Sequence, residues 1–229
     1  MKIYSKWKNP CSYLEALSLQ EKKVFNIINK KSDKKSIYIL AGSHFPVVTS
    51  GLRSSGIKDF TNKKKLIEKN FFFTKVKRGG SVTVHMPEQL VVYPILSLDF
   101  FNIDIKEWVN FLKESFQKLI KIKYGMHLDN KEDGLYFKNK KILFVGLRVK
   151  NRVSYHGISL NVNNNLESFN WINPCGYKNL QVTSLSRELE YCCNLKEIYT
   201  NWLEYLKDFI ISKTGLSYEH IKHIKHIKN

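Results

Sequence analysis

Apolar residues recur at helical spacing in three stretches of the chain, and a capping box marks the start of two of them. Ser12 with Glu15 forms the first box, and Asp104 with Glu107 forms the second. The second box opens the clearest helix, whose apolar face holds Ile105, Trp108, Val109, Leu112, Phe116, Leu119 and Ile120. The three predicted helices cover about residues 12–28, 104–120 and 195–211.

Between these helices the pattern changes to runs and alternations that are typical of strands. β-Branched and aromatic residues fill 36–40 and 47–49, and 71–98 is predicted as a strand, a glycine-rich turn and a strand. Residues 134–149 and 154–162 alternate like two antiparallel strands, joined through a basic turn. We predict a mixed α+β fold, with helices packed against a largely antiparallel sheet. The segments 29–35 and 62–65 are predicted as polar loops.

The sequence has no internal repeat and no long linker, so residues 1–229 are predicted to form one domain. The last residues, about 214–229, end in a His-Ile-Lys repeat and are interpreted as a low-complexity tail. Histidines spaced by three drift around a helix, and the tail has no cysteine beside them to complete a metal site. We therefore predict no metal.

The 38 basic and 20 acidic residues give a formal charge of +18. This charge fits a nucleic acid, an anionic membrane or an acidic protein as partner, and it fits equally a generally basic surface. No apolar run is suited to span a membrane, and no signal peptide is visible at the start. The four cysteines form no disulfide framework, so we expect free thiols and a cytoplasmic protein.

The pair Gly79-Gly80 lies in a segment where backbone N–H groups can approach a ligand. It is not a phosphate-binding loop, because no Gly-Lys-Ser/Thr follows, and no dinucleotide-binding fingerprint is present. The sequence therefore predicts no nucleotide cofactor and gives phosphate binding no support.

Cys175 stands between Pro174 and Gly176, a setting that fixes the backbone before the thiol and leaves it open afterwards. A nucleophilic cysteine needs a positive group nearby, and Lys141, His85 and His156 are the candidates. Spacing along the chain does not choose among them. The competing interpretation is that Cys175 is a small buried hydrophobic residue.

Five segments in order resemble the lipoyl(octanoyl) transferases, also called the lipoate-protein ligase B type. They are H-F-P-V-V-T-S-G from His44, R-G-G-S-V-T-V-H from Arg78, K-I-L-F-V-G-L-R from Lys141, H-G-I-S-L-N-V-N from His156 and I-N-P-C-G-Y from Ile172. The resemblance spans roughly residues 38–185. It implies the biotin/lipoate ligase-transferase fold, which agrees with the α+β prediction.

By this resemblance, Cys175 is expected to carry an octanoyl thioester and Lys141 to lower its pKa and move protons. The donor is expected to be octanoyl-acyl carrier protein. The acceptors are expected to be lysines of the lipoyl domains of 2-oxoacid dehydrogenases and of the glycine cleavage H protein. No cofactor, nucleic acid or membrane is implied, and we expect a monomer. The residues expected to line the substrate site are Arg78, Gly79, Gly80, Ser81, Val82, Thr83, Val84, His85, Phe144, Val145, Gly146, His156, Gly157, Ile158 and Ser159.

The chain departs from the family pattern after the Arg-Gly-Gly segment. Val84 replaces an aromatic residue, and Met86 and Glu88 replace two glycines. If these two positions have positive φ, each side chain costs about 1 kcal/mol, and the loop is expected to follow another path.

Two other functions remain open from the sequence. The first is an ATP-dependent lipoate or biotin ligase on the same fold, which a requirement for ATP would distinguish. The second is a non-catalytic module that binds acyl groups or nucleic acid, which predicts salt-dependent nucleic-acid binding without acylation.

Overall fold

A computed structural model describes residues 1–29, 34–174 and 180–224 of the chain. Its main feature is an eight-stranded sheet in the order β11-β1-β2-β6-β10-β9-β8-β7. The pairs from β2 to β7 are antiparallel, whereas β1 pairs in parallel with β2 and with β11. The strands are β1 (Lys2–Cys11), β2 (Ser36–His44), β6 (Gln89–Ser97), β7 (Asp129–Lys131), β8 (Gly134–Phe137), β9 (Lys140–Lys150), β10 (Val153–Asn161) and β11 (Lys222–Ile224).

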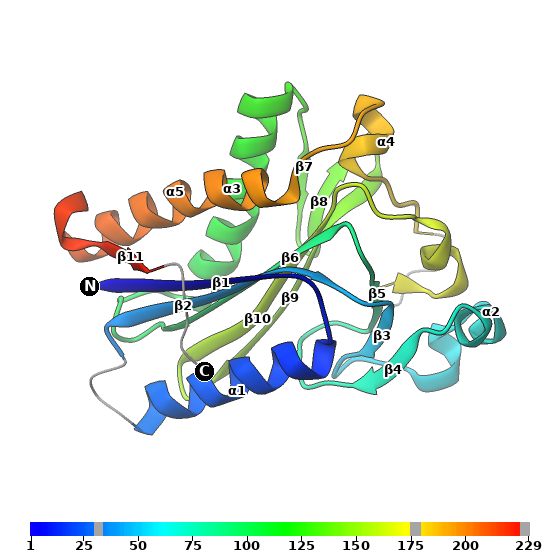
Figure 1. The fold of residues 1–229 in the computed structure, drawn as a ribbon, viewed down its shortest axis with the longest axis horizontal. Helices are drawn as coiled ribbons and strands as arrows, with labels where there is room; N and C mark the ends of the chain where they lie inside the picture. Colours follow the sequence, from blue (N-terminus) through cyan, green and yellow to red (C-terminus); the bar gives the residue numbers. More distant parts are fainter. Residues whose placement is uncertain (30–33, 175–179, 225–229) are drawn as a thin grey trace.

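Helices cover both faces of this sheet (Figure 1). On one face α3 (Ile105–Tyr124) and α5 (Leu195–Thr214) pack together, and Trp108 and Trp202 are fully buried in the main core. On the other face lies α1 (Tyr13–Asn29). Because both faces are covered, β2 and β6 are buried along their whole length, which explains their nearly continuous apolar sequences.

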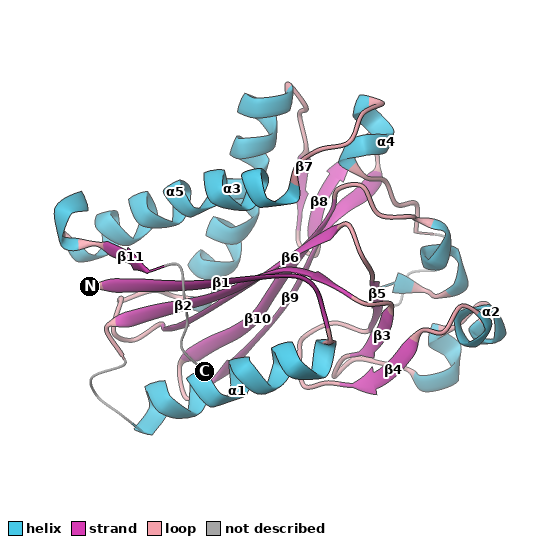
Figure 2. Ribbon diagram, viewed as in Figure 1, coloured by secondary structure: helices cyan, strands magenta, loops and turns pink. Residues whose placement is uncertain are grey.

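A second, three-stranded sheet in the order β4-β3-β5 lies beside the main one (Figure 2). The short helix α2 (Lys63–Glu68) accompanies it. A separate small core forms between this sheet and the chain around Trp171. Its strands are β3 (Val47–Ser50), β4 (Phe72–Lys75) and β5 (Val82–His85), and the remaining short elements are η2 (Gly56–Asp59), η3 (Glu167–Trp171), α4 (Leu185–Leu189) and η5 (Tyr218–His220).

The α+β prediction and the three long helices are confirmed, and several details differ. The predicted loop 62–65 is wrong, because the Asn62 side chain accepts a hydrogen bond from the Lys65 N–H and caps α2. The predicted strand 134–149 is two strands, joined at Lys138 and Asn139. Both of these have positive φ, as a tight hairpin turn requires. The described part of the tail adds β11 to the sheet, and the number of domains stays a prediction.

Candidate active site

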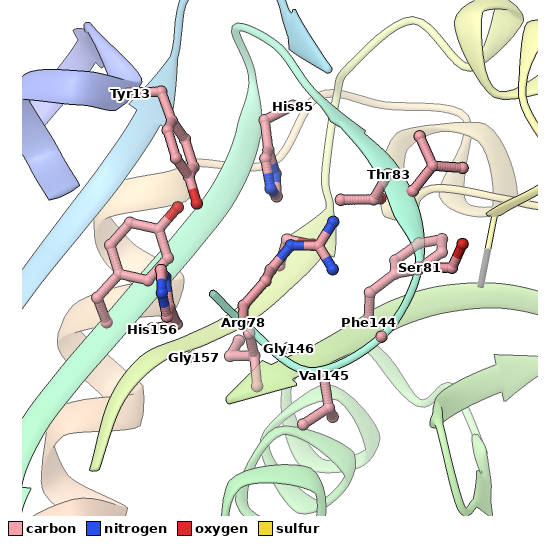
Figure 3. Close-up of a pocket in the computed structure, with 15 residues that line it drawn as sticks. Tyr13, Arg78, Ser81, Thr83, His85, Phe144, Val145, Gly146, His156 and Gly157 are labelled. Atoms are coloured by element: carbon pink, nitrogen blue, oxygen red, sulfur yellow. The ribbon is translucent and has the colours of Figure 1, made fainter. Parts of the chain in front are cut away.

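A pocket lies where β5, β9 and β10 meet the loop that carries Arg78 (Figure 3). It holds about 470 Å³ of empty space when its open mouth is included. Among the predicted substrate residues, all line this pocket except Gly79 and Val84. Tyr13 and Tyr93 also line it and were not predicted from the sequence, because they come from α1 and β6, outside the recognised segments.

Gly79 and Val84 support the wall from behind. The Gly79 N–H donates to the Leu147 carbonyl at 2.9 Å, which joins the Arg78 loop to β9. Val84 is fully buried in the small core with Met86 and Phe144. These two residues therefore shape the pocket without facing it.

Arg78 is buried, and its guanidinium is held by β3. The Nη2 group donates to the Thr49 carbonyl and to Thr49 Oγ1, at 2.8 Å each. A Cβ at Gly146 would lie 3.2 Å from Arg78 Cδ, so a side chain there would crowd the arginine. The arrangement places a fixed positive charge beside the pocket wall.

A chain of hydrogen bonds joins the pocket to the backbone of Lys141. His85 Nδ1 lies 2.7 Å from Gln89 Oε1, and Gln89 Nε2 donates to Asn161 Oδ1 at 3.0 Å. The Asn161 amide donates to the Thr183 carbonyl, and the Thr183 N–H donates to the Lys141 carbonyl, at 2.9 Å each. Since these groups are buried and mutually bonded, they fix the relative position of β5, β6, β10 and Lys141.

The histidines of this region are neutral near pH 7. Burial lowers the pKa of His44 to about 4. Burial and the neighbouring His44 lower the pKa of His85 to about 3. Burial and the Arg78 charge lower the pKa of His156 to about 3. Of the three sequence candidates for a positive partner of Cys175, His85 and His156 therefore do not supply the charge.

Lys141 lies on β9 with its side chain fully buried. Its Nζ lies 2.5 Å from Asp133 Oδ2 and 4.9 Å from the centre of the Phe144 ring. Phe144 lines the pocket, so the ammonium group is behind one wall of it rather than among the lining residues. The Asp133 carboxylate is the ion-pair partner that a buried ammonium requires, and no carboxylate among the described residues pairs with His85 or His156.

Asp133 was not predicted from the sequence, and it is the second residue of the two-residue turn Glu132-Asp133 between β7 and β8. Tyr136 donates its hydroxyl to this carboxylate at 3.0 and 3.1 Å. Burial alone would raise the pKa of Asp133, but the hydrogen bond and charge of Lys141 outweigh burial and lower it. Only the pairing of β8 with β9 brings Asp133 to Lys141, which is why spacing along the chain did not reveal it.

Cys175 lies outside the described residues. The described residues on each side of its segment are held by backbone hydrogen bonds. On one side the Asn173 N–H donates to the Asp59 carbonyl at 2.7 Å, and Ile172 pairs with Phe60. On the other side the Lys141 N–H donates to the Gln181 carbonyl at 2.8 Å. The described chain that resumes after Cys175 therefore pairs directly with the strand that carries Lys141.

The altered loop after Val84 forms a turn between β5 and β6. Of the two positions where the family has glycine, only Glu88 has positive φ, at +65°. Met86 is buried in the small core instead. The Glu88 carboxylate accepts from Asn163 Nδ2 at 2.9 Å, and its carbonyl accepts from the Asn163 N–H at 3.1 Å, so two hydrogen bonds hold the strained residue.

The remaining cysteines play no part in this site. Cys11, Cys192 and Cys193 are free thiols, as predicted. Cys11 is buried beside His44, and burial raises the pKa of its thiol to about 11, which disfavours the thiolate.

The described residues contain no group of three His, Cys, Asp or Glu side chains that could hold a metal ion. None of their helices is long and apolar enough to cross a membrane.

Comparison with known proteins identifies the family. Residues 12–207 match the model of the lipoyl protein ligase A/B catalytic domain. An octanoyltransferase of Caldicellulosiruptor bescii is 41% identical over 76% of this chain and 77% of that protein. An octanoyltransferase of Caldicellulosiruptor saccharolyticus is 35% identical over 100% of this chain and 97% of that protein.

Among solved structures, a bipartite lipoate protein ligase from Thermoplasma acidophilum has the same fold, with a TM-score of 0.70. At 10% sequence identity it covers 100% of this chain and 87% of its own. The chain therefore belongs to the lipoyl protein ligase A/B catalytic domain family, and its sequence relatives there are octanoyltransferases.

Proposed function

We propose that this protein is an octanoyltransferase that moves an octanoyl group from octanoyl-acyl carrier protein to a lysine of an acceptor domain. The acceptors are the lipoyl domains of 2-oxoacid dehydrogenases and the glycine cleavage H protein. The observation that carries the proposal is the buried Lys141 ammonium, which lies behind the pocket wall on a strand bridged to Val182, in the described chain that follows Cys175. The identity to octanoyltransferases gives the acyl group.

In the proposed mechanism Cys175 and Lys141 act as a dyad. The Cys175 thiolate attacks the carbonyl of the donor thioester, and the departing thiol of the carrier takes a proton from the Lys141 ammonium. The neutral amine of the acceptor lysine then attacks the octanoyl-Cys175 thioester. Its proton passes to Lys141, and Cys175 leaves as the thiolate, so the dyad returns to its starting state.

The pocket offers polar groups for the thioester as well as apolar surface for the chain. Thr83 Oγ1 and His156 Nδ1 are buried at the pocket and have no hydrogen-bond partner within the described residues. Such atoms are available to a bound substrate or to water. We assign them to the polar end of the acyl donor, and Val145, Ile158 and the Phe144 ring to the apolar chain.

Intact mass spectrometry tests the covalent intermediate. Incubation with octanoyl-acyl carrier protein in the absence of ATP is expected to add one octanoyl group, and neutral hydroxylamine is expected to remove it. Cys175→Ala is expected to abolish the addition, whereas Cys192→Ala, at an exposed cysteine, is expected to leave it unchanged. A modified Cys175→Ala protein would contradict the proposal.

The same experiment separates the alternatives that share the fold. Because a lipoate protein ligase has the same fold, an ATP-dependent ligase is one alternative function. A ligase would acylate an acceptor domain from free octanoate or lipoate only when ATP is added. A non-catalytic binding module would give no acylation in either condition.

A further inference from the structure

The segment from Gly51 to Lys77 has an unusual surface. It contains eight basic and two acidic residues, so its net charge of +6 is one third of the chain's +18, in 27 of 229 residues. All eight basic side chains are exposed, and of the two acidic ones Asp59 is buried. We call the exposed residues of this segment the basic-apolar face. Its basic members are Arg53, Lys58, Lys63, Lys64, Lys65, Lys69, Lys75 and Lys77.

Large apolar side chains are exposed on the same segment. Ile57 is 85% exposed and Leu52 is 65% exposed, and Ile67 and Phe72 are also exposed. Protein interfaces combine such apolar anchors with a charged rim, whereas a merely solvated basic surface has no need of them. Figure 1 shows α2 and β4 at the end of the molecule that lies away from α5 and the N-terminus.

This face is joined to the pocket by backbone hydrogen bonds. The Leu52 N–H donates to the Arg78 carbonyl, and the Arg53 N–H donates to the Gly80 carbonyl, at 3.0 Å each. Arg78 and Gly80 both line the pocket. A protein bound on the face is therefore next to one wall of the pocket that its acyl group would enter.

Hydrogen bonds to the buried Asp59 also hold the basic-apolar face in place. The buried Asp59 carboxylate accepts hydrogen bonds from the hydroxyls of Ser54 and Ser81, at 2.5 and 3.1 Å. Its carbonyl accepts from the Asn173 N–H, two residues before Cys175. The loop, the pocket wall and the chain that leads to Cys175 thus share one anchor.

We infer that the basic-apolar face is the docking surface for the acyl donor, a small acidic carrier protein that presents its acyl thioester on a flexible arm. The inference rests on the proposed function, and it adds where on the molecule the donor binds. The donor is chosen over the acceptor domain because the face adjoins the pocket wall that would receive the acyl chain.

The chemistry of the face favours an acidic protein over a nucleic acid. Seven of its eight basic residues are lysine, and only Arg53 has the planar fork that binds phosphate through two parallel hydrogen bonds. Lysines neighbour exposed apolar residues along the chain, as Lys58 follows Ile57 and Lys69 follows closely after Ile67, and such pairs suit carboxylates beside an apolar contact.

A charge-reversal experiment tests the inference. The triple variant Lys58→Glu, Lys69→Glu, Lys75→Glu changes three exposed lysines of the face. The matched control, Lys22→Glu, Lys106→Glu, Lys121→Glu, makes the same change in net charge at exposed lysines of α1 and α3. Steady-state rates are measured with octanoyl-acyl carrier protein and with octanoyl-N-acetylcysteamine, a small thioester that has no protein part.

The face variant is expected to raise KM for the carrier protein about tenfold or more, with kcat and the rate on the small thioester unchanged. The control is expected to change KM by less than about threefold. Equal effects of the two variants would overturn the inference, because they would show a diffuse charge effect. A raised KM for the acceptor domain alone, or an equal loss of rate on the small thioester, would overturn it too.

A binding measurement keeps the inference separate from the proposed function. Fluorescence anisotropy of a labelled acyl carrier protein is expected to show weaker binding to the face variant than to the control. If the unmodified enzyme transfers no octanoyl group at all, the proposed function fails, and this measurement still decides where the carrier binds. Tighter binding of a DNA or RNA oligonucleotide than of the carrier would contradict the choice of partner.

Discussion

The two sides of the pocket differ in whether a buried base has a carboxylate partner. On the side of β2, β5 and β6, His44 and His85 are buried with no carboxylate partner among the described residues, and burial keeps them neutral. On the side of β8 and β9, Lys141 is equally buried but lies 2.5 Å from the Asp133 carboxylate. The difference teaches that burial alone does not make a reactive site. The position of one carboxylate decides which buried base has an ion-pair partner.

Removing the Lys141 side-chain amine is expected to have the largest effect on activity. Lys141→Met keeps the apolar volume and removes the ammonium, and we expect kcat to fall about 10³-fold because proton transfer is lost. Lys140→Met is the matched control, since the neighbouring lysine is partly exposed and pairs with Glu188 at 3.3 Å. Octanoyl transfer to an acceptor domain is the measurement. Similar losses in both variants would contradict the role of Lys141.

Removing only the carboxylate tests whether Asp133 positions the Lys141 ammonium. Asp133→Asn is expected to lower kcat roughly tenfold to a hundredfold, because the ammonium loses the carboxylate that holds it in place. Tyr136→Phe keeps the carboxylate and is expected to have a smaller effect. Asp129→Asn, at an exposed position of β7, is the control. An unchanged kcat in Asp133→Asn would show that the carboxylate has no part in positioning Lys141.

Because the buried histidines are neutral in the folded protein, we expect the protein to lose stability in mild acid. Their pKa values in the folded protein, about 3 to 4, lie below the ordinary value of 6.5, so unfolding takes up protons as the pH falls below 6.5. The free energy of unfolding is expected to fall by about 1 kcal/mol per pH unit for each such histidine between pH 6 and pH 4.5.

Urea unfolding at a series of pH values measures this slope. His85→Gln removes one buried histidine and is expected to make the slope shallower. The exposed His127→Gln is expected to leave it unchanged. A free energy of unfolding that is constant from pH 6.5 to pH 4.5 would refute the neutral cluster.

The smallest expected effect concerns Glu88, which precedes the Gln89 that binds His85. Glu88→Gly and Glu88→Ala both remove the hydrogen bond that the Glu88 carboxylate accepts from Asn163 Nδ2. Only glycine is unstrained at a φ of +65°. We therefore expect Glu88→Gly to be more stable than Glu88→Ala by about 1 kcal/mol, as measured by urea unfolding. Equal stabilities would show that the strain is relieved by movement of the turn.

The sequence predicted the pocket better than it predicted the charges around it. The recognised segments supplied most of the lining residues, because each stays contiguous along one strand or loop. Asp133, Tyr13 and Tyr93 were missed, since they reach the site only through strand pairing and helix packing. The chemistry of His85 and His156 was also open, because burial sets their charge and burial is a property of the fold.

The errors in the fold have similar causes. The strand β1 was not predicted, because five of its ten residues are polar or charged and its stability comes from pairing with β2 and β11. The helix α2 looked like a loop because three successive lysines dominate it, and its Asn62 cap and single buried Leu66 decide otherwise. The roles of Cys175 and of the substrate residues stay predictions.

The hairpin turn at Lys138 and Asn139 decides which of two adjacent lysines belongs to the site. Neighbouring residues of a strand point to opposite sides of the sheet, and the turn pairs Lys141 with Tyr136 and Lys140 with Phe137. A slip of one residue in this pairing would turn Lys141 outward and bring Lys140 to the inner face. The identity of the proposed proton carrier thus depends on the two-residue turn that immediately precedes β9.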